Sequence, residues 1–385
     1  MMNRRFLYVL RDSISYLLRD SISQLHSIFA LHRINMSGIF YPTRPPPNRP
    51  RGTADAECTA ASRSPNTTAT VEDARLPRPL ITFQPPSSYF ELGRMEFMLF
   101  SSTCSGKDQI IGTDQMGNTL LNSTDSHIIR VMPTLNQKKR MPISLIVGDS
   151  LYAMDTFPRP SDAKCFEAFT HGPASSNLFS TLDWHWHSLP PPPYVFEPGY
   201  ELPNSYIRSY TVVRHSDILV SAKDIGTYSF DIVSRAWSKI GDWVLPFSGR
   251  AEYIPEYDLW FGLSSYDDNN LLCTSDLSAA SELKPPMLRH IWEDNLKPPQ
   301  DWVRGLAYAV HLGSGKFCIA RFFETPEEDP CEGGSGFIHW GCERFVVLIG
   351  VEVERCGEDG GGLRMITRRS KRYRLPNSKL PALVL

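Results

Sequence analysis

Three short segments with the same ending constrain the fold of this chain more than any other feature. Leu151–Asp155 (LYAMD), Thr227–Asp231 (TYSFD) and Leu272–Asp276 (LCTSD) each place an Asp at the close of a β-type run, and Trp and then Pro follow each one. Asp231 and Asp276 are 45 residues apart, a spacing typical of a four-stranded propeller blade. The Asp side chain can cap the following turn, and the indole can cover the seam with a neighbouring blade.

Other parts of the chain are also short β-type runs bounded by Gly, Asp, Asn and Pro. The runs cover residues 96–100, 128–132, 143–147, 207–213, 218–220, 317–323 and 345–353. Amphipathic helical stretches are scarce, which argues against α/β folds, where a helix joins successive parallel strands. We therefore expect an all-β, kelch-like β-propeller of about six blades, with five and seven as alternatives.

Composition divides the chain into four parts. Residues 1–41 are expected to supply N-terminal strands to the propeller, and residues 80–376 its main body. Between them, residues 42–79 contain Pro45–Pro47 and scarcely an apolar side chain before Val71, so we expect a disordered N-terminal insertion there. Residues 377–385 are expected to form a C-terminal tail. Further loop insertions are expected at 157–183, 190–193 and 324–336.

An eight-residue tandem copy lies near the N-terminus. Tyr8–Ser15 reads YVLRDSIS and Tyr16–Ser23 reads YLLRDSIS. Eight residues are too few for a folding unit, so we interpret the copy as a recent duplication within a strand or loop.

Three longer stretches carry a family resemblance. They are Leu31–Ser37 (LHRINMS), Leu189–Tyr194 (LPPPPY) and Gly226–Gly262 (GTYSFDIVSRAWSKIGDWVLPFSGRAEYIPEYDLWFG). Together they resemble the plant family, expanded in grasses, known as domain of unknown function 1668. The resemblance implies a plant protein with a kelch or F-box-associated propeller, and it implies no activity or catalytic residue. The chain departs from the family pattern at its N-terminal duplication and near Glu327, and it lacks the double glycine of kelch blades.

Charge and cysteine content bear on location and partners. The chain has 42 acidic and 40 basic residues, a net charge of -2, so we expect neither nucleic acid nor a membrane as partner. The first apolar run, Phe6–Leu10, is too short for a secretory signal. None of the eight cysteines forms a C-x-x-C pair, so we expect reduced thiols in a monomer in the cytoplasm or nucleus.

Four groups of residues are candidates for chemistry. Asp183, His185 and His187 could share one face of a strand, but a closed zinc site needs four ligands, so we predict no metal site. Glycines at 333–336 and 360–362 are interpreted as hairpin loops. Six basic residues between Arg364 and Arg374 are interpreted as a solvated last strand, with a nuclear signal or nucleic-acid patch as the alternative. Carboxylates available for a central channel are Asp114, Glu252, Glu256, Asp258 and Asp267.

No catalytic, cofactor-binding or metal-ligating residue is predicted, because no established catalytic or phosphate-binding motif is present. We expect a non-enzymatic module that binds a partner protein. The alternative is a hydrolase or carbohydrate-binding propeller that uses channel carboxylates. An apolar patch on the loop face would favour the first, and two carboxyls about 5 to 10 Å apart in an open channel would favour the second.

Overall fold

The computed structural model describes residues 4–385 except 20–21, 42–70, 88–92, 102–107, 127, 174–181, 199, 201–204, 281–283, 295, 327–341, 357–361, 377 and 379–382. The described chain is almost entirely β-strand, with one short helix, α1 (Ser37–Phe40), and one 3₁₀ turn, η1 (Pro193–Phe196). No helix in these ranges is long and apolar enough to cross a membrane. The thiols of Cys165, Cys273, Cys318 and Cys356 are unpaired.

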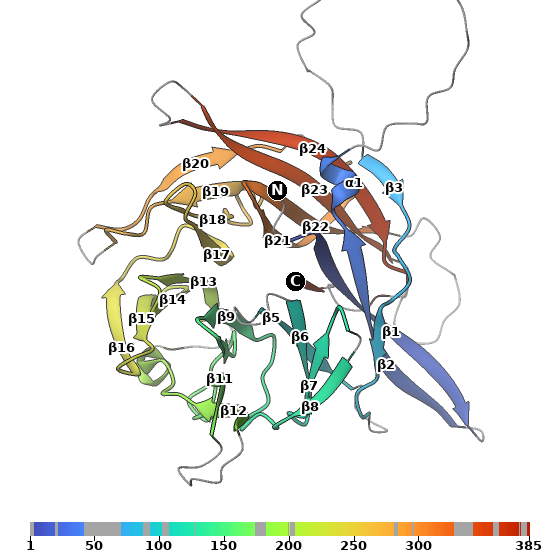
Figure 1. Ribbon diagram of the computed structural model, residues 1–385, viewed down its shortest axis with the longest axis horizontal. Helices are drawn as coiled ribbons and strands as arrows, with labels where there is room; N and C mark the ends of the chain where they lie inside the picture. Colours follow the sequence, from blue (N-terminus) through green and yellow to red (C-terminus); the bar gives the residue numbers. More distant parts are fainter. Residues whose placement is uncertain are drawn as a thin grey trace, which may run out of the picture.

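The strands form sheets that stand around a common centre (Figure 1). The first sheet has the order β25 (Leu383–Val384), β1 (Phe6–Arg19), β2 (Ile22–Asn35), β4 (Ile81–Phe83). The second has the order β5 (Met95–Ser101), β6 (Asp108–Asp114), β7 (Thr119–Ser123), β8 (Ile128–Met132). The third has the order β9 (Ile143–Val147), β10 (Ser150–Met154), β11 (Phe166–Pro173), β12 (Leu182–Ser188).

The next eight strands form one continuous sheet made of two sets of four. The sets are β13 (Ile207–Val213), β14 (Asp217–Ala222), β15 (Gly226–Asp231), β16 (Ala236–Gly241), and β17 (Ser248–Ile254), β18 (Leu259–Leu263), β19 (Leu272–Ser275), β20 (Leu288–Trp292). Their first strands pair in parallel, with Ser209 opposite Gly249 and Tyr210 opposite Arg250. The last sheet has the order β21 (Val303–Gly313), β22 (Lys316–Pro326), β23 (Cys342–Cys356), β24 (Gly362–Arg374), β3 (Val71–Ala74).

The core lies between the sheets. Each of the hydrophobic clusters found among the described residues contains side chains from two neighbouring sets of strands, and together the clusters link all sets into a closed ring. Phe166 of the third sheet meets Phe230 of the next set edge to face at 4.9 Å. Leu7 and Leu348 belong to the cluster that joins the first sheet to the last. A single sheet buries little alone, so stacking supplies the core, and the expected all-β propeller is confirmed.

Two segments expected outside the propeller contribute strands to it. The sequence predicts that residues 71–79 belong to the insertion, yet β3 pairs in parallel with β24 over Ser370–Tyr373. It also predicts a tail for residues 377–385, yet β25 pairs with β1 as the innermost strand of the first sheet. Both are short strands that gain their stability from a neighbour distant in sequence, which composition cannot reveal. Residues 42–70 lie outside the described residues.

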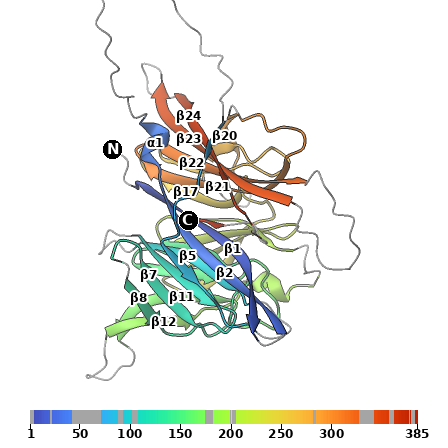
Figure 2. The ribbon, with the colours of Figure 1, turned by 90° about the vertical axis from the view of Figure 1, so that its right-hand side faces the viewer.

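All seven predicted β runs lie within strands, namely β5, β8, β9, β13, β14, β22 and β23. The tandem copy is accommodated in the long hairpin of β1 and β2, whose strands lie side by side (Figures 1 and 2). Its first half contributes Tyr8, which is buried and donates a hydrogen bond from its hydroxyl to Thr124 Oγ1 at 2.9 Å.

The repeat that predicted the blades holds for two of its three units. Asp231 and Asp276 close the third strands β15 and β19, and each accepts backbone hydrogen bonds from the next turn, from Val233 at 2.8 Å and Ser278 at 2.9 Å. Asp155 instead follows β10, the second strand of its sheet. The Asp of the first unit is therefore not equivalent to the other two.

The antiparallel order gives the ring two different faces. The turns between second and third strands, and the connections between sheets, lie at one end, which we call the loop face. The turns between first and second strands and between third and fourth strands lie at the other end, which we call the opposite face. The hydrogen bond from the Arg4 backbone to Leu312 O and the ion pair of Arg4 with Asp108 both lie on the opposite face.

Candidate functional site

The structure does not assemble a metal site from Asp183, His185 and His187. All three lie on β12, where the two imidazole centroids are 6.4 Å apart. The Asp183 carboxylate is held by the Arg130 guanidinium at 2.7 and 2.8 Å. The described residues contain no cluster of three or more His, Cys, Asp or Glu side chains suited to a metal ion. The neighbouring Trp184 stacks on Phe169 at 4.9 Å.

The five channel carboxylates named from the sequence do not converge. Asp114 caps the β6–β7 turn by accepting from the backbone of Met116 and Asn118 at 2.8 and 2.9 Å. Asp267 lies in the β18–β19 turn on the loop face, whereas Glu256 and Asp258 lie in the β17–β18 turn on the opposite face.

Asp258 accepts a hydrogen bond from the Tyr253 hydroxyl at 2.7 Å. Glu252 is the one carboxylate of the five that lies within a first strand, β17. These carboxylates therefore do not form a single site.

Two other carboxyls, on the first strand β5 and directly after the second strand β10, influence each other electrostatically. Burial raises the pKa of the Glu96 carboxyl on β5 to about 7; the Met141 backbone hydrogen bond lowers it, and the Asp155 carboxylate adds to the rise. Burial likewise raises the pKa of Asp155 to about 6, against the hydrogen bond that the Arg140 backbone donates at 2.6 Å. Carboxyls that titrate near neutrality are characteristic of functional sites, although structural networks produce them too.

Sequence reasoning missed Glu96 and gave Asp155 a different role. The available signal was the charge of Glu96 inside the apolar run Met95–Phe100 (MEFMLF) of a first strand. A carboxylate at such a position must face either a core or the ring axis.

The cavity beside Glu96 is narrow. Its volume is about 30 Å³, and Arg94, Asp114, Lys138 and Arg140 line it with Glu96. This is the space of about one water molecule, whereas ligand sites typically enclose about 300 to 1,000 Å³. Within the described residues, the cavity beside Glu96 therefore leaves no room for a sugar ring.

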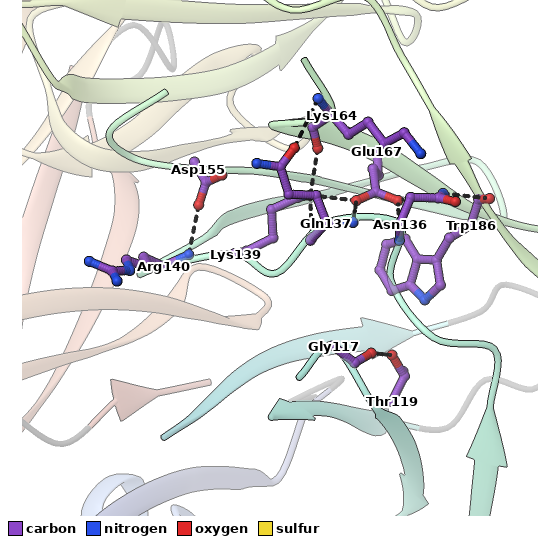
Figure 3. A network of polar contacts seen from close by, with 10 residues as sticks. All are labelled: Gly117, Thr119, Asn136, Gln137, Lys139, Arg140, Asp155, Lys164, Glu167 and Trp186. Atoms are coloured by element: carbon purple, nitrogen blue, oxygen red, sulfur yellow. Dashed lines mark hydrogen bonds and ion pairs between the residues drawn. The ribbon is translucent and has the colours of Figure 1, made fainter. Parts of the chain in front are cut away.

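A buried polar network fixes the loop that forms one wall of this cavity (Figure 3). Lys139 Nζ lies 2.5 Å from Glu167 Oε1, and it also donates to the carbonyls of Gln137 and Lys164 at 2.9 and 2.8 Å. The other Glu167 oxygen accepts from the Asn136 backbone at 3.0 Å and side chain at 2.7 Å. Every one of these charges is paired, so the network holds residues 136–140 in place on the third sheet.

Apolar side chains project from the loops on both sides of the cavity. Met116, in the β6–β7 turn, is 68% exposed, and Met141, in the connection before β9, is 57% exposed. Phe196, Val244 and Tyr266 are also exposed and lie in loops at the same end of the ring. The loop face therefore carries apolar side chains next to the basic Arg94, Lys138 and Arg140.

The basic cluster at 364–374 lies on β24, and carboxylates of the flanking strands neutralise most of it. Arg368 pairs with Glu352 at 2.6 Å, Arg372 with Asp73 at 2.6 Å and Arg374 with Glu343 at 2.9 Å. Arg364 pairs with Glu354, and Arg369 lies near Glu72. The segment is thus a strand with long basic side chains, as interpreted, but it is not a solvated last strand, because β25 follows it and β3 pairs along its edge. The glycines at 333–336 and 360–361 lie outside the described residues.

Comparison with known proteins places the chain in a sequence family. Residues 4–373 match the family described as "Protein of unknown function (DUF1668)". No curated protein matches the chain.

Two solved structures are similar at low sequence identity. The β-propeller domain of Cps50 (Swd1) from Myceliophteria thermophila is 9% identical, covers 70% of this chain and 82% of its own, and has a TM-score of 0.32. A protein of unknown function from Bacteroides thetaiotaomicron VPI-5482 is 7% identical, covers 82% of this chain and 76% of its own, and has a TM-score of 0.32. Likeness at this level supports no functional argument.

Proposed function

Because the chain belongs to the DUF1668 family, described as proteins of unknown function, we propose its function from its own surface: it is a non-enzymatic module that binds a partner protein through the loop face. The observation that carries this proposal is the exposure of Met116 and Met141 on neighbouring loops, beside Arg140. Methionine and arginine are enriched in protein interfaces, whereas Lys and Glu are depleted there.

The support for this site comes from its rigidity as well as its composition. The Lys139–Glu167 pair fixes the loop that carries Met141 and Arg140, so little conformational freedom is lost when a partner docks. Exposed apolar side chains that gather on one face, unlike single ones, are typical of interaction sites.

The experiment is affinity capture from native tissue with three forms of the full chain. We compare wild type, Met116→Asp/Met141→Asp and the control Val233→Asp/Met287→Asp. Val233 and Met287 are 81% and 78% exposed and lie in connections between strands on the opposite face. A protein retained by wild type and the control but lost with the loop-face variant supports the proposal. A partner lost equally with both variants, or with neither, contradicts it.

A hydrolase or carbohydrate-binding propeller is the second candidate, favoured by the raised pKa values of Glu96 and Asp155. The 30 Å³ cavity weighs against it. Hydrolysis of 4-nitrophenyl glycosides by wild type, lost in Glu96→Gln, would replace the first proposal by this one.

The proposal extends to the origin, partner class and location of the protein. The resemblance in Gly226–Gly262 supports a kelch-like protein of plant origin. The ion pairing along β24 supports a protein partner rather than a nucleic acid, because a nucleic-acid site needs free basic side chains. The free thiols support the cytoplasm or nucleus, and we expect the chain to act there as a monomer without a cofactor.

A further inference from the structure

A second surface, away from the loop-face methionines, has the properties of a binding site. It is a groove of about 680 Å³ between the first sheet and the last, where the segment after β3 crosses toward β4. Its volume lies within the range of known ligand sites. The charged and titratable groups that line it are Arg11, His32, Asp73, Arg75, Arg78 and Arg374.

The groove is basic in a chain whose net charge is -2. Four guanidinium groups line it against the single carboxylate of Asp73. That carboxylate is already engaged, because Arg372 donates to both of its oxygens at 2.6 and 3.0 Å. Arg75 and Arg78 are exposed, and neither has an ion-pair partner within the described part of the chain. Two arginines are therefore available to an anion.

His32 supplies an independent observation in the wall of the same groove. Its side chain is only 4% exposed, and its Nδ1 lies 2.7 Å from the carbonyl oxygen of Pro77. A carbonyl oxygen can only accept, so Nδ1 carries the proton. The other ring nitrogen, Nε2, is buried and has no hydrogen-bond partner among the described residues. Such an orphaned atom is costly in a finished protein interior.

The two observations together select the ligand chemistry. The arginines require negatively charged oxygens, and a neutral His32 Nε2 requires a donor. Burial and the nearby Arg11 both lower the pKa of His32, which keeps the ring neutral. A phosphate monoester satisfies both requirements in its monoanionic form, which prevails below its second pKa of about 6 and presents oxygen acceptors and one O–H donor together. A carboxylate or a sulfate presents acceptors alone.

We propose that this groove binds a phosphorylated serine or threonine side chain on a segment of another protein. The walls formed by Arg75, Pro77 and Arg78 are solvent-exposed, so the groove is open to an extended chain. The site is separate from the loop-face methionines, and its test does not depend on the function proposed above.

The test is fluorescence polarisation with a labelled Gly-Ser heptapeptide carrying a central phosphoserine, at pH 6, where about half of the phosphoserine keeps its second proton. We expect saturable binding to the full chain, and at least tenfold weaker binding of the serine and glutamate versions. Arg75→Gln/Arg78→Gln should weaken the phosphopeptide at least tenfold. The control Arg159→Gln/Arg235→Gln removes two exposed arginines elsewhere and should leave the affinity unchanged.

Three results would overturn the proposal. They are equal binding of the phosphorylated and serine peptides, an equal loss in the control variant, and competition by inorganic phosphate as effective as by the phosphopeptide itself. The last result would assign the groove to a free phosphate rather than to a protein segment. His32→Asn supplies a further check, since the amide can still donate to Pro77 while Nε2 is removed. It should weaken the phosphopeptide more than the glutamate peptide.

Discussion

Lys139 Nζ lies 2.5 Å from Glu167 Oε1, and both side chains are completely removed from solvent. Removing one member of such a pair leaves an uncompensated buried charge, which costs about 3 to 5 kcal/mol. We expect Lys139→Met to lower the free energy of unfolding by that amount, measured by urea denaturation at pH 7. The loop holding Arg140 and Met141 depends on this pair, so partner binding by the loop face should fall as well.

The double variant Lys139→Met/Glu167→Gln removes both charges, and the glutamine oxygen can still accept from Asn136, but its amide group then faces the Gln137 backbone N–H that Glu167 Oε1 accepts. We expect it to recover part of the stability lost in Lys139→Met, because much of the cost of the single variant comes from the unpaired charge. A double variant no more stable than Lys139→Met would show that the pair acts through its packing instead.

The raised pKa of the Glu96 carboxyl predicts that the free energy of unfolding depends on pH. Its folded-state pKa of about 7 is above the ordinary value of 4.5, so between these values the folded state binds more protons than the unfolded state. Stability therefore falls as pH rises from about 4.5 to about 7. Asp155 acts in the same direction between 3.8 and about 6.

We expect Glu96→Gln to be more stable than wild type above pH 7, by about 3 kcal/mol, and to lose that advantage near pH 4. Urea denaturation across pH 4 to 8 measures this, with Glu256→Gln, an exposed carboxylate on the opposite face, as the control. A Glu96→Gln curve parallel to that of wild type would contradict the assignment.

The pairing of β25 with β1 closes the ring, so we expect substitutions in this C-terminal strand to lower the stability of the fold. Val384 is buried opposite Val9 in β1, and the Leu385 backbone donates to Tyr8 O at 3.0 Å. We expect Val384→Asp to lower the free energy of unfolding by roughly 2 to 4 kcal/mol, because it buries a charge in the cluster that joins the first and last sheets. Val131→Asp, at an exposed position on the outer strand β8, should change stability little. Equal losses in thermal unfolding would mean that β25 does not close the ring.

The sequence predicted this fold well where the signal was local. Strands such as Ile143–Val147 have the bounds that the sequence predicts, because alternation and flanking turn residues operate over a few positions. The capping role of Asp231 was equally readable. By contrast, β3 and β25 are defined by partners hundreds of residues away, and nothing within their own few residues signals that pairing.

The candidate sites were less accessible to sequence reasoning for the same reason. Glu96 and Asp155 come from different sheets, and the basic groove joins Arg11 to Arg78 and Arg374 across the ring closure. A propeller builds its sites from separate blades, so no contiguous motif records them. The basic run at 364–374 is the opposite case. It is conspicuous in the sequence, yet most of its charges are ion-paired within its own sheet and form no open site.

The tryptophans of the repeat supply the last prediction. Trp237 on β16 donates from Nε1 to Pro190 O at 2.8 Å and packs on Phe166 at 5.7 Å, so it covers the seam with the third sheet. Trp292 occupies the corresponding outer strand β20, stacks on Phe261 and has no indole hydrogen bond in the described structure. Both Trp→Phe changes lose ring area, but only Trp237→Phe also leaves a carbonyl without its donor. We therefore expect Trp237→Phe to cost about 1 kcal/mol more than Trp292→Phe in urea denaturation, and equal costs would show that the seam is held by ring packing alone.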